Sequence, residues 1–140
     1  MTLAFDVPVT TSFGTLSEEP TPLSVQTAQY RSLIDDGAVV VDLRSAQARH
    51  ADGALLGAIA LDLDDALTLL TPGAPGALRS ASYEARWLLI TEDGYDAEQL
   101  AWHLQARGVR GARFLVGGHR ALRAAGITGA VDAAAHHLFS

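Results

Sequence analysis

Short apolar runs alternate with helix-like segments along the middle of this chain, and this alternation restricts the fold more than any other feature. The run 38–43 is rich in valine and apolar on both faces, as is typical of a strand inside a parallel sheet. The runs 59–63, 87–90 and 113–116 are also short and apolar. Strands that alternate with helices at this spacing predict parallel βαβ units with right-handed crossovers, and therefore a three-layer α/β/α domain.

The segments between these runs carry helix signals. Helices are expected after Ser24, at 46–51, from Asp64 onward, at 96–107 and at 119–125. Ser24 can cap the first of them, which stops before Gly37. The segment 96–107 is the clearest, because its apolar residues recur with helical spacing and Gly108 stands in the C′ position.

Composition along the chain indicates one folded domain with two flanking segments. Residues 1–22 are rich in Thr, Ser, Glu and Pro without periodicity, which predicts an irregular N-terminal arm. Residues 23–127 hold the alternating pattern, and 128–140 form a C-terminal tail that can include a short helix. The 140 residues are enough for one hydrophobic core.

The charged residues exclude several classes of function. All ten basic residues are arginine, and sixteen Asp and Glu leave a net charge of -6. Without a basic cluster we expect no nucleic-acid binding, because phosphate contacts need such a surface. Without lysine, Schiff-base chemistry and a Walker-type phosphate loop are both impossible.

Cysteine is absent, so disulfides, zinc–thiolate sites and thiolate mechanisms are excluded in this chain. The first nine residues lack the basic and apolar parts of a signal peptide, and no run approaches the length of a membrane-spanning helix. We therefore expect a cytoplasmic protein that does not contact a membrane. The sequence gives no indication of the oligomeric state.

The five histidines show no metal-binding spacing. His136 and His137 are neighbours, and His50, His103 and His119 are scattered. Metal sites in proteins are usually built from ligands in recognisable clusters. We therefore expect histidines that are exposed or hydrogen-bonded, and neither a metal site nor a cofactor.

Three motifs in order resemble the rhodanese family. They are Asp42-Leu43-Arg44, the segment Gly53-Ala54-Leu55-Leu56-Gly57-Ala58, and the segment 114–126 with its Gly117-Gly118 turn. The second is similar to the family's Gly-His-Ile-Pro-Gly-Ala, with Ala54 and Leu56 in place of His and Pro. The resemblance covers about 23–127, is to the single-domain bacterial type, and implies a mainly parallel five-stranded sheet.

The resemblance also locates the loop that would carry the chemistry. In the family, the catalytic cysteine follows the fourth strand and opens a Cys-x-x-Gly-x-Arg loop whose backbone N–H groups hold the sulfur. The corresponding segment here is Thr91-Glu92-Asp93-Gly94-Tyr95-Asp96, with Thr91 in the place of the cysteine. A threonine hydroxyl cannot carry a sulfane sulfur, nor replace the cysteine of the phosphatases and arsenate reductases related to this fold.

The loop has also become acidic. At about 6 Å and an effective dielectric of ~20, each of Glu92, Asp93 and Asp96 would oppose a bound anion by roughly 3 kcal/mol before screening. One interpretation is that Thr91, Asp93 or Asp96 only caps the following helix. The other is that the loop is an acidic recognition surface for a basic partner or a cation, with Tyr95 as an exposed contact.

These observations favour a non-catalytic rhodanese-homology domain that binds a protein or ligand in a regulatory role linked to sulfur metabolism. One alternative is a sulfurtransferase, which rests on family resemblance alone. Another is a cysteine-independent enzyme that uses the same pocket, but Thr91 would need a base, and His103 lies well along the next helix. Asp42 and Arg44 are expected to form a structural ion pair.

Overall fold

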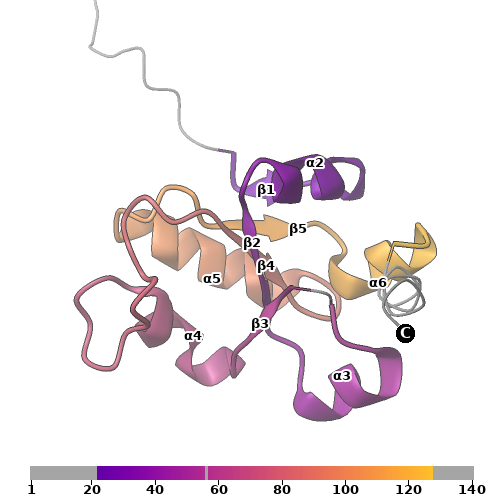
Figure 1. Ribbon diagram of the computed structural model, residues 1–140, viewed down its shortest axis with the longest axis horizontal. Coiled ribbons are helices and arrows are strands. Elements are labelled where there is room, and N and C mark those ends of the chain that lie inside the picture. The colour runs from indigo at the N-terminus through magenta and orange to yellow at the C-terminus, as the bar shows by residue number, and fades with distance from the viewer. Residues whose placement is uncertain (1–21, 56, 128–140) are drawn as a thin grey trace, which may run out of the picture.

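Five parallel strands form the centre of the computed structural model, which describes residues 22–55 and 57–127. The strands are β1 (Ser24–Val25), β2 (Val39–Asp42), β3 (Ile59–Ala60), β4 (Trp87–Ile90) and β5 (Arg113–Leu115). Their order across the sheet is β1-β5-β4-β2-β3, so β4 lies in the middle (Figure 1). The predicted parallel five-stranded sheet is confirmed.

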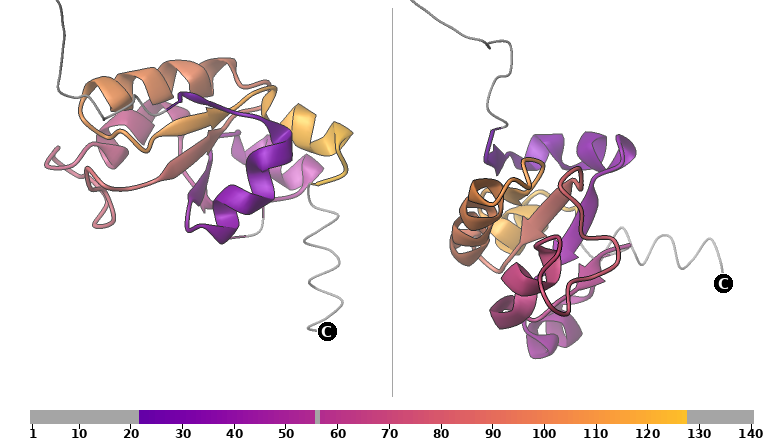
Figure 2. Two further views of the ribbon diagram at one scale, coloured as in Figure 1. Left: turned by 90° about the horizontal axis from the view of Figure 1, so that it is seen from above. Right: turned by 90° about the vertical axis from the view of Figure 1, so that its left-hand side faces the viewer.

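Helices cover both faces of this sheet. They are α2 (Tyr30–Asp35), preceded by the 3-10 turn η2 (Thr27–Gln29), α3 (Ala46–Asp52), α4 (Leu63–Leu70), α5 (Tyr95–Ala106) and α6 (Gly118–Ala124). The two views of Figure 2 show α5 and α2 on opposite sides of the strands. The predicted three-layer α/β/α architecture is therefore confirmed.

Alternate residues of the central strands supply two cores. Val41 and Leu89 pack with α4 and α5 on one face, whereas Val40, Leu88 and Ile90 pack with α2 and α6 on the other. Side chains of a strand point alternately to the two faces of a sheet, so a strand apolar on both faces serves both layers. This explains why the strand at 87–90 is apolar throughout, and why the strand at 39–42 is apolar up to Asp42, its last residue.

The start of the domain differs from the prediction. Ser24 does not cap a helix but lies in β1, an edge strand that accepts hydrogen bonds from β5 through the carbonyls of Leu23 and Val25. The helical segment begins after Gln26, whose backbone N–H donates to the side chain of Gln29. The expected capping by Ser24 was wrong because pairing with β5 satisfies the backbone there. A two-residue strand is too short to show periodicity.

The flanking segments lie mostly outside the described residues, so the predicted N-terminal arm and C-terminal tail stay predictions. Of the five histidines, His136 and His137 also lie there. In the described part of the chain, no helix has the length and apolar character needed to cross a membrane.

Two glycines allow the loop after β4 to contact the turn before α6. Gly94 and Gly118 both have positive φ values, of 91° and 60°. A Cβ on Gly118 would lie 2.3 Å from the carbonyl oxygen of Thr91, and one on Gly94 would lie 2.9 Å from that of Leu115. Across this contact, the N–H groups of His119 and Arg120 donate to the carbonyls of Thr91 and Glu92 at 2.9 and 3.0 Å. Backbone therefore packs directly on backbone here.

We predict that Gly118→Ala lowers the free energy of unfolding by about 3 kcal/mol, because the new methyl group meets the Thr91 carbonyl in a strained conformation. The matched control is Gly73→Ala, which has a similar φ of 81° but no atom within 4 Å of the added Cβ. This control should cost only about 1 kcal/mol. Urea unfolding measures both, and equal losses in the two variants would show that the close contact has no importance.

Candidate functional site

The predicted site residues meet at the carboxyl ends of the central strands. β2 and β4 are neighbours, and the register places Asp42 beside Ile90, the residue before Thr91. The loop 91–94 follows from that point and leads into α5. In parallel α/β sheets, this edge is where ligand sites usually form. The structure thus brings together Asp42, Arg44 and the loop, as the resemblance implies.

Asp42 and Arg44 form the expected ion pair. The Arg44 guanidinium donates to both carboxylate oxygens of Asp42, at 3.0 and 2.8 Å, and the two side chains are almost fully buried. Arg44 Nη2 also donates to the carbonyl of Gly53 at 2.8 Å, which ties the end of α3 to β2. A pair this buried is costly to break, because the remaining charge would lack a partner.

The side chain of Thr91 accepts hydrogen bonds from backbone N–H groups of the following loop and of α5. The residue is only 5% exposed, and its hydroxyl oxygen accepts from the N–H groups of Gly94 at 3.1 Å and Ala97 at 3.4 Å. Asp93 Oδ1 accepts from the N–H of Tyr95 at 3.0 Å. Thr91 and Asp93 therefore satisfy the first turn of α5, as the capping interpretation predicts, while Asp96 is an exposed residue.

The acidic side chains of the loop point in different directions. Asp93 and Asp96 are exposed, and Tyr95 between them is 66% exposed. Glu92 is instead partly buried, and its Oε1 atom has no hydrogen-bond partner among the described residues. The exposed part of the loop is therefore the acidic surface formed by Asp93, Tyr95 and Asp96, without Glu92.

His119 differs from the expectation of an exposed or hydrogen-bonded histidine. It is fully buried, and neither ring nitrogen has a hydrogen-bond partner within the described part of the chain. Burial lowers the pKa of His119, and the charge of Arg44 lowers it further, whereas the nearby carboxylates of Glu92, Asp42 and Asp52 oppose the shift. The expectation was wrong because the Gly117-Gly118 turn directs this first part of α6 into the core.

The fold also assembles a cluster that the sequence spacing did not reveal. Asp52 at the end of α3, Glu92 and His119 each offer a ligand atom, and these atoms all lie within 4.8 Å of one another. Figures 1 and 2 show α3 and α6 on the same side of the molecule. The three residues come from separate elements, so only the topology of the sheet could have indicated their contact.

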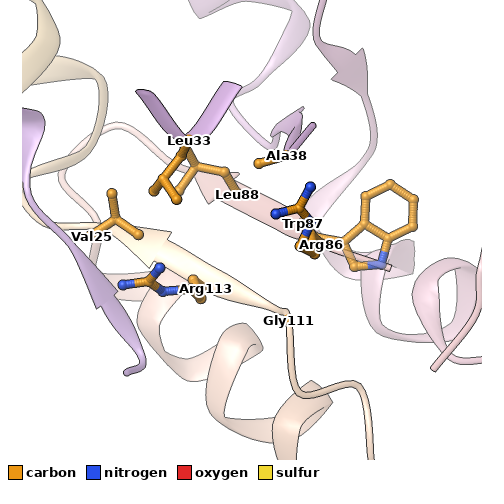
Figure 3. Close-up of a pocket in the computed structure, with 8 residues that line it drawn as sticks. All are labelled: Val25, Leu33, Ala38, Arg86, Trp87, Leu88, Gly111 and Arg113. Carbon is orange, nitrogen blue, oxygen red and sulfur yellow. The ribbon is translucent and has the colours of Figure 1, made fainter. Parts of the chain in front are cut away.

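One cavity in the described part of the chain lies away from this site. This cavity of about 180 Å³ lies at the amino ends of the strands, opposite the carboxyl ends where the site residues meet. Its lining is Val25, Leu33, Ala38, Arg86, Trp87, Leu88, Gly111 and Arg113 (Figure 3). Arg113 Nη2 donates to the carbonyl of Ser24, whereas its buried Nε atom has no partner among the described residues. None of the loop residues 91–96 borders this cavity.

Solved structures share the fold. A human single-domain sulfurtransferase is 26% identical, with a TM-score of 0.60 over 74% of this chain and 96% of its own. A rhodanese homologue from Thermus thermophilus is also 26% identical, with a TM-score of 0.51 over 69% of this chain and 96% of its own. A Rhodopseudomonas palustris protein of unknown function, described as a possible tyrosine phosphatase, is 23% identical, with a TM-score of 0.67 over 74% of this chain and 80% of its own.

No protein-family model and no curated protein matches the sequence. The structural likeness, together with the strand order, shows that the chain has a rhodanese-like fold. A catalytic cysteine is absent from this rhodanese-like fold, since the chain contains no cysteine at all.

We predict that His119 makes the domain less stable in mild acid. Its pKa is lowered in the folded state, so below the unfolded value of about 6.5 the unfolded chain binds the proton more readily. The contribution of the neutral imidazole is therefore complete above pH ~6.5 and is lost as the pH falls through the folded pKa. Urea unfolding from pH 7.5 to 5.5, with a chelator present, should show this loss.

The variant His119→Leu should lack this part of the pH dependence, because it has no group to protonate. The control His103→Asn, at an exposed position of α5, should retain it. The prediction fails if wild type and His119→Leu lose stability in parallel.

Proposed function

We propose that this chain is a non-catalytic rhodanese-homology domain, which acts as a protein- or ligand-binding module with a regulatory role linked to sulfur metabolism. The observation that carries the proposal is the position of the Thr91 hydroxyl. Its oxygen accepts from the N–H group of Gly94, in the loop that in the family holds sulfur, and from the N–H group of Ala97 in the first turn of α5. A neutral hydroxyl replaces the anion, and the loop keeps its shape.

Electrostatics support the same conclusion. Fixed N–H groups at a helix start stabilise a thiolate only when the surrounding charge permits an anion. Here Glu92 and Asp93 follow Thr91 directly, and the nearby Arg44 is neutralised by Asp42. An anionic substrate in this loop would meet carboxylates without a compensating cation of comparable burial.

Enzyme activities suggested by the fold find little support in these residues. Sulfur transfer through a persulfide requires a thiolate, and so does cysteine-dependent phosphate chemistry. Neither is possible in a chain without cysteine. For a cysteine-independent reaction, Thr91 would need a base that takes its proton. His103, the histidine nearest in sequence, is exposed on α5, whereas Thr91 is buried and its hydroxyl oxygen already accepts from the N–H groups of Gly94 and Ala97.

The surface available for recognition is the exposed acidic surface of Asp93, Tyr95 and Asp96. An aromatic ring between two carboxylates suits a basic protein surface, because Tyr and Arg are enriched at interfaces. Opposite charge would also speed association. The partner we propose is therefore a protein with an Arg- or Lys-rich face.

The first test restores sulfur to the loop. We predict that wild type gives no thiosulfate-to-cyanide sulfur transfer above a no-protein control, and that Thr91→Cys alone remains at least roughly tenfold below Thr91→Cys/Glu92→Gln/Asp93→Asn. The triple variant keeps the side-chain oxygen that accepts from the N–H of Tyr95. Activity of wild type would overturn the proposal, and full activity of Thr91→Cys alone would overturn the electrostatic argument.

The second test concerns the acidic surface. We predict that Asp93→Asn/Asp96→Asn loses a protein that wild type retains from a lysate of its native cell at low salt. The matched control is Asp35→Asn/Asp36→Asn, which removes the same charge from exposed residues at the end of α2. Quantitative mass spectrometry compares the three eluates. If all three retain the same proteins equally, the acidic surface is not the recognition site.

A further inference from the structure

Asp52, Glu92 and His119 form a cluster that the proposed recognition surface does not use. We propose that this cluster, called the triad site below, binds one divalent transition-metal ion of the zinc type. One imidazole and two carboxylates would then be the protein ligands, with at least one coordination position left for water or another ligand.

The burial of unpartnered polar atoms is the first argument for a ligand. His119 is fully buried with both ring nitrogens unpaired, and the Oε1 atom of Glu92 is buried and unpaired as well, within the part of the chain that the structure describes. Leaving such groups without hydrogen bonds is unfavourable, so each case calls for an explanation. Both groups lie around the same point, together with Asp52.

The geometry is close to that of a metal site. Ligand atoms bound at about 2.1 Å in a tetrahedral arrangement lie roughly 3.4 Å apart. The three candidate atoms lie within 4.8 Å of one another, so closure needs movements of about an ångström. Glu92 lies in a loop and Asp52 is the last residue of α3, so both can adjust toward the imidazole.

The charges of the surroundings also permit a cation. Two carboxylates and a neutral imidazole match a double positive charge. Arg123 Nη1 lies 3.4 Å from Asp52 Oδ1, and Arg120 Nε lies 3.9 Å from Glu92 Oε2. The side chains of Arg123 and Arg120 are 54% and 69% exposed. Such surface ion pairs contribute little, so a metal ion can displace both arginines.

Arg44 also influences this cluster, because its charge lowers the pKa of His119. Its guanidinium is held by both carboxylate oxygens of Asp42 at 3.0 and 2.8 Å. Its positive charge opposes a bound cation, and the carboxylate of Asp42 compensates for this charge only in part.

The donor set selects the kind of ion. A buried imidazole nitrogen suits Zn²⁺ and similar borderline ions, whereas Ca²⁺ and Mg²⁺ prefer sites built from oxygen ligands and water. Copper(I) prefers thiolate and thioether ligands, which the triad site lacks. The triad site shares no residue with the acidic surface of Asp93, Tyr95 and Asp96, so either proposal can fail without the other.

The test uses the full chain, freed of metal with a chelator and then titrated with Zn²⁺ alone by calorimetry. We expect one equivalent per chain bound by the triad site, and at least tenfold weaker binding at that site in Asp52→Asn and in His119→Asn. Arg123→Ala should bind more tightly, because it removes the cation that competes for Asp52. Co²⁺ should give visible absorption bands in wild type that both ligand variants lose.

Other histidines could bind zinc, so two control variants are needed. His103→Asn and the double variant His136→Asn/His137→Asn should leave binding at the triad site unchanged. Because Asp52 is only partly buried, Asp52→Asn keeps the test valid if His119→Asn does not fold. The proposal is overturned if wild type binds no Zn²⁺, if Asp52→Asn binds Zn²⁺ as tightly as wild type does, or if binding disappears in the double variant.

Discussion

The contact between the loop after β4 and the Gly117-Gly118 turn is the constraint on which this site depends. Two backbone segments approach so closely that a Cβ on Gly118 would lie 2.3 Å from a carbonyl oxygen. This contact sets the path of Thr91 and Glu92, and it directs His119 into the interior. The position of the Thr91 loop and the arrangement of the triad site therefore both depend on the absence of a side chain at Gly118. The sheet alone would bring these segments near each other without fixing their orientation.

Thr91 explains how the loop keeps its form without the cysteine. The N–H groups at the start of a helix need acceptors, and an empty loop would leave them unsatisfied. The Thr91 hydroxyl and the Asp93 carboxylate supply these acceptors from within the loop. The N–H groups of Gly94, Tyr95 and Ala97 therefore have acceptors without an anionic group bound in the loop. A fold of this kind does not by itself determine the chemistry, because fold and function are separable.

The sequence allowed most of the architecture to be predicted, because the central strands are apolar on both faces and the helix signals between them are clear. The strand at 87–90 and the helix that follows it illustrate this. Ser24 was misplaced because pairing with a distant strand, and not a local signal, determines its conformation. In the site, the order of the loop residues could be read, but the inward direction of Glu92 could not. The contact of His119 with Asp52 and Glu92 depends on three separate elements, and no spacing along the chain encodes it.

The buried hydroxyl of Thr91 has a consequence for the cellular conditions under which the domain can work. A thiolate in such a loop is a target for peroxide and alkylating reagents, and its oxidation adds oxygen atoms that a tight backbone contact cannot accommodate. A threonine undergoes none of these reactions, and the chain has no thiol at all. The shape of the loop is therefore independent of the redox state of its surroundings. A surface built on this loop would present the same face to a partner during oxidative stress as in reducing conditions.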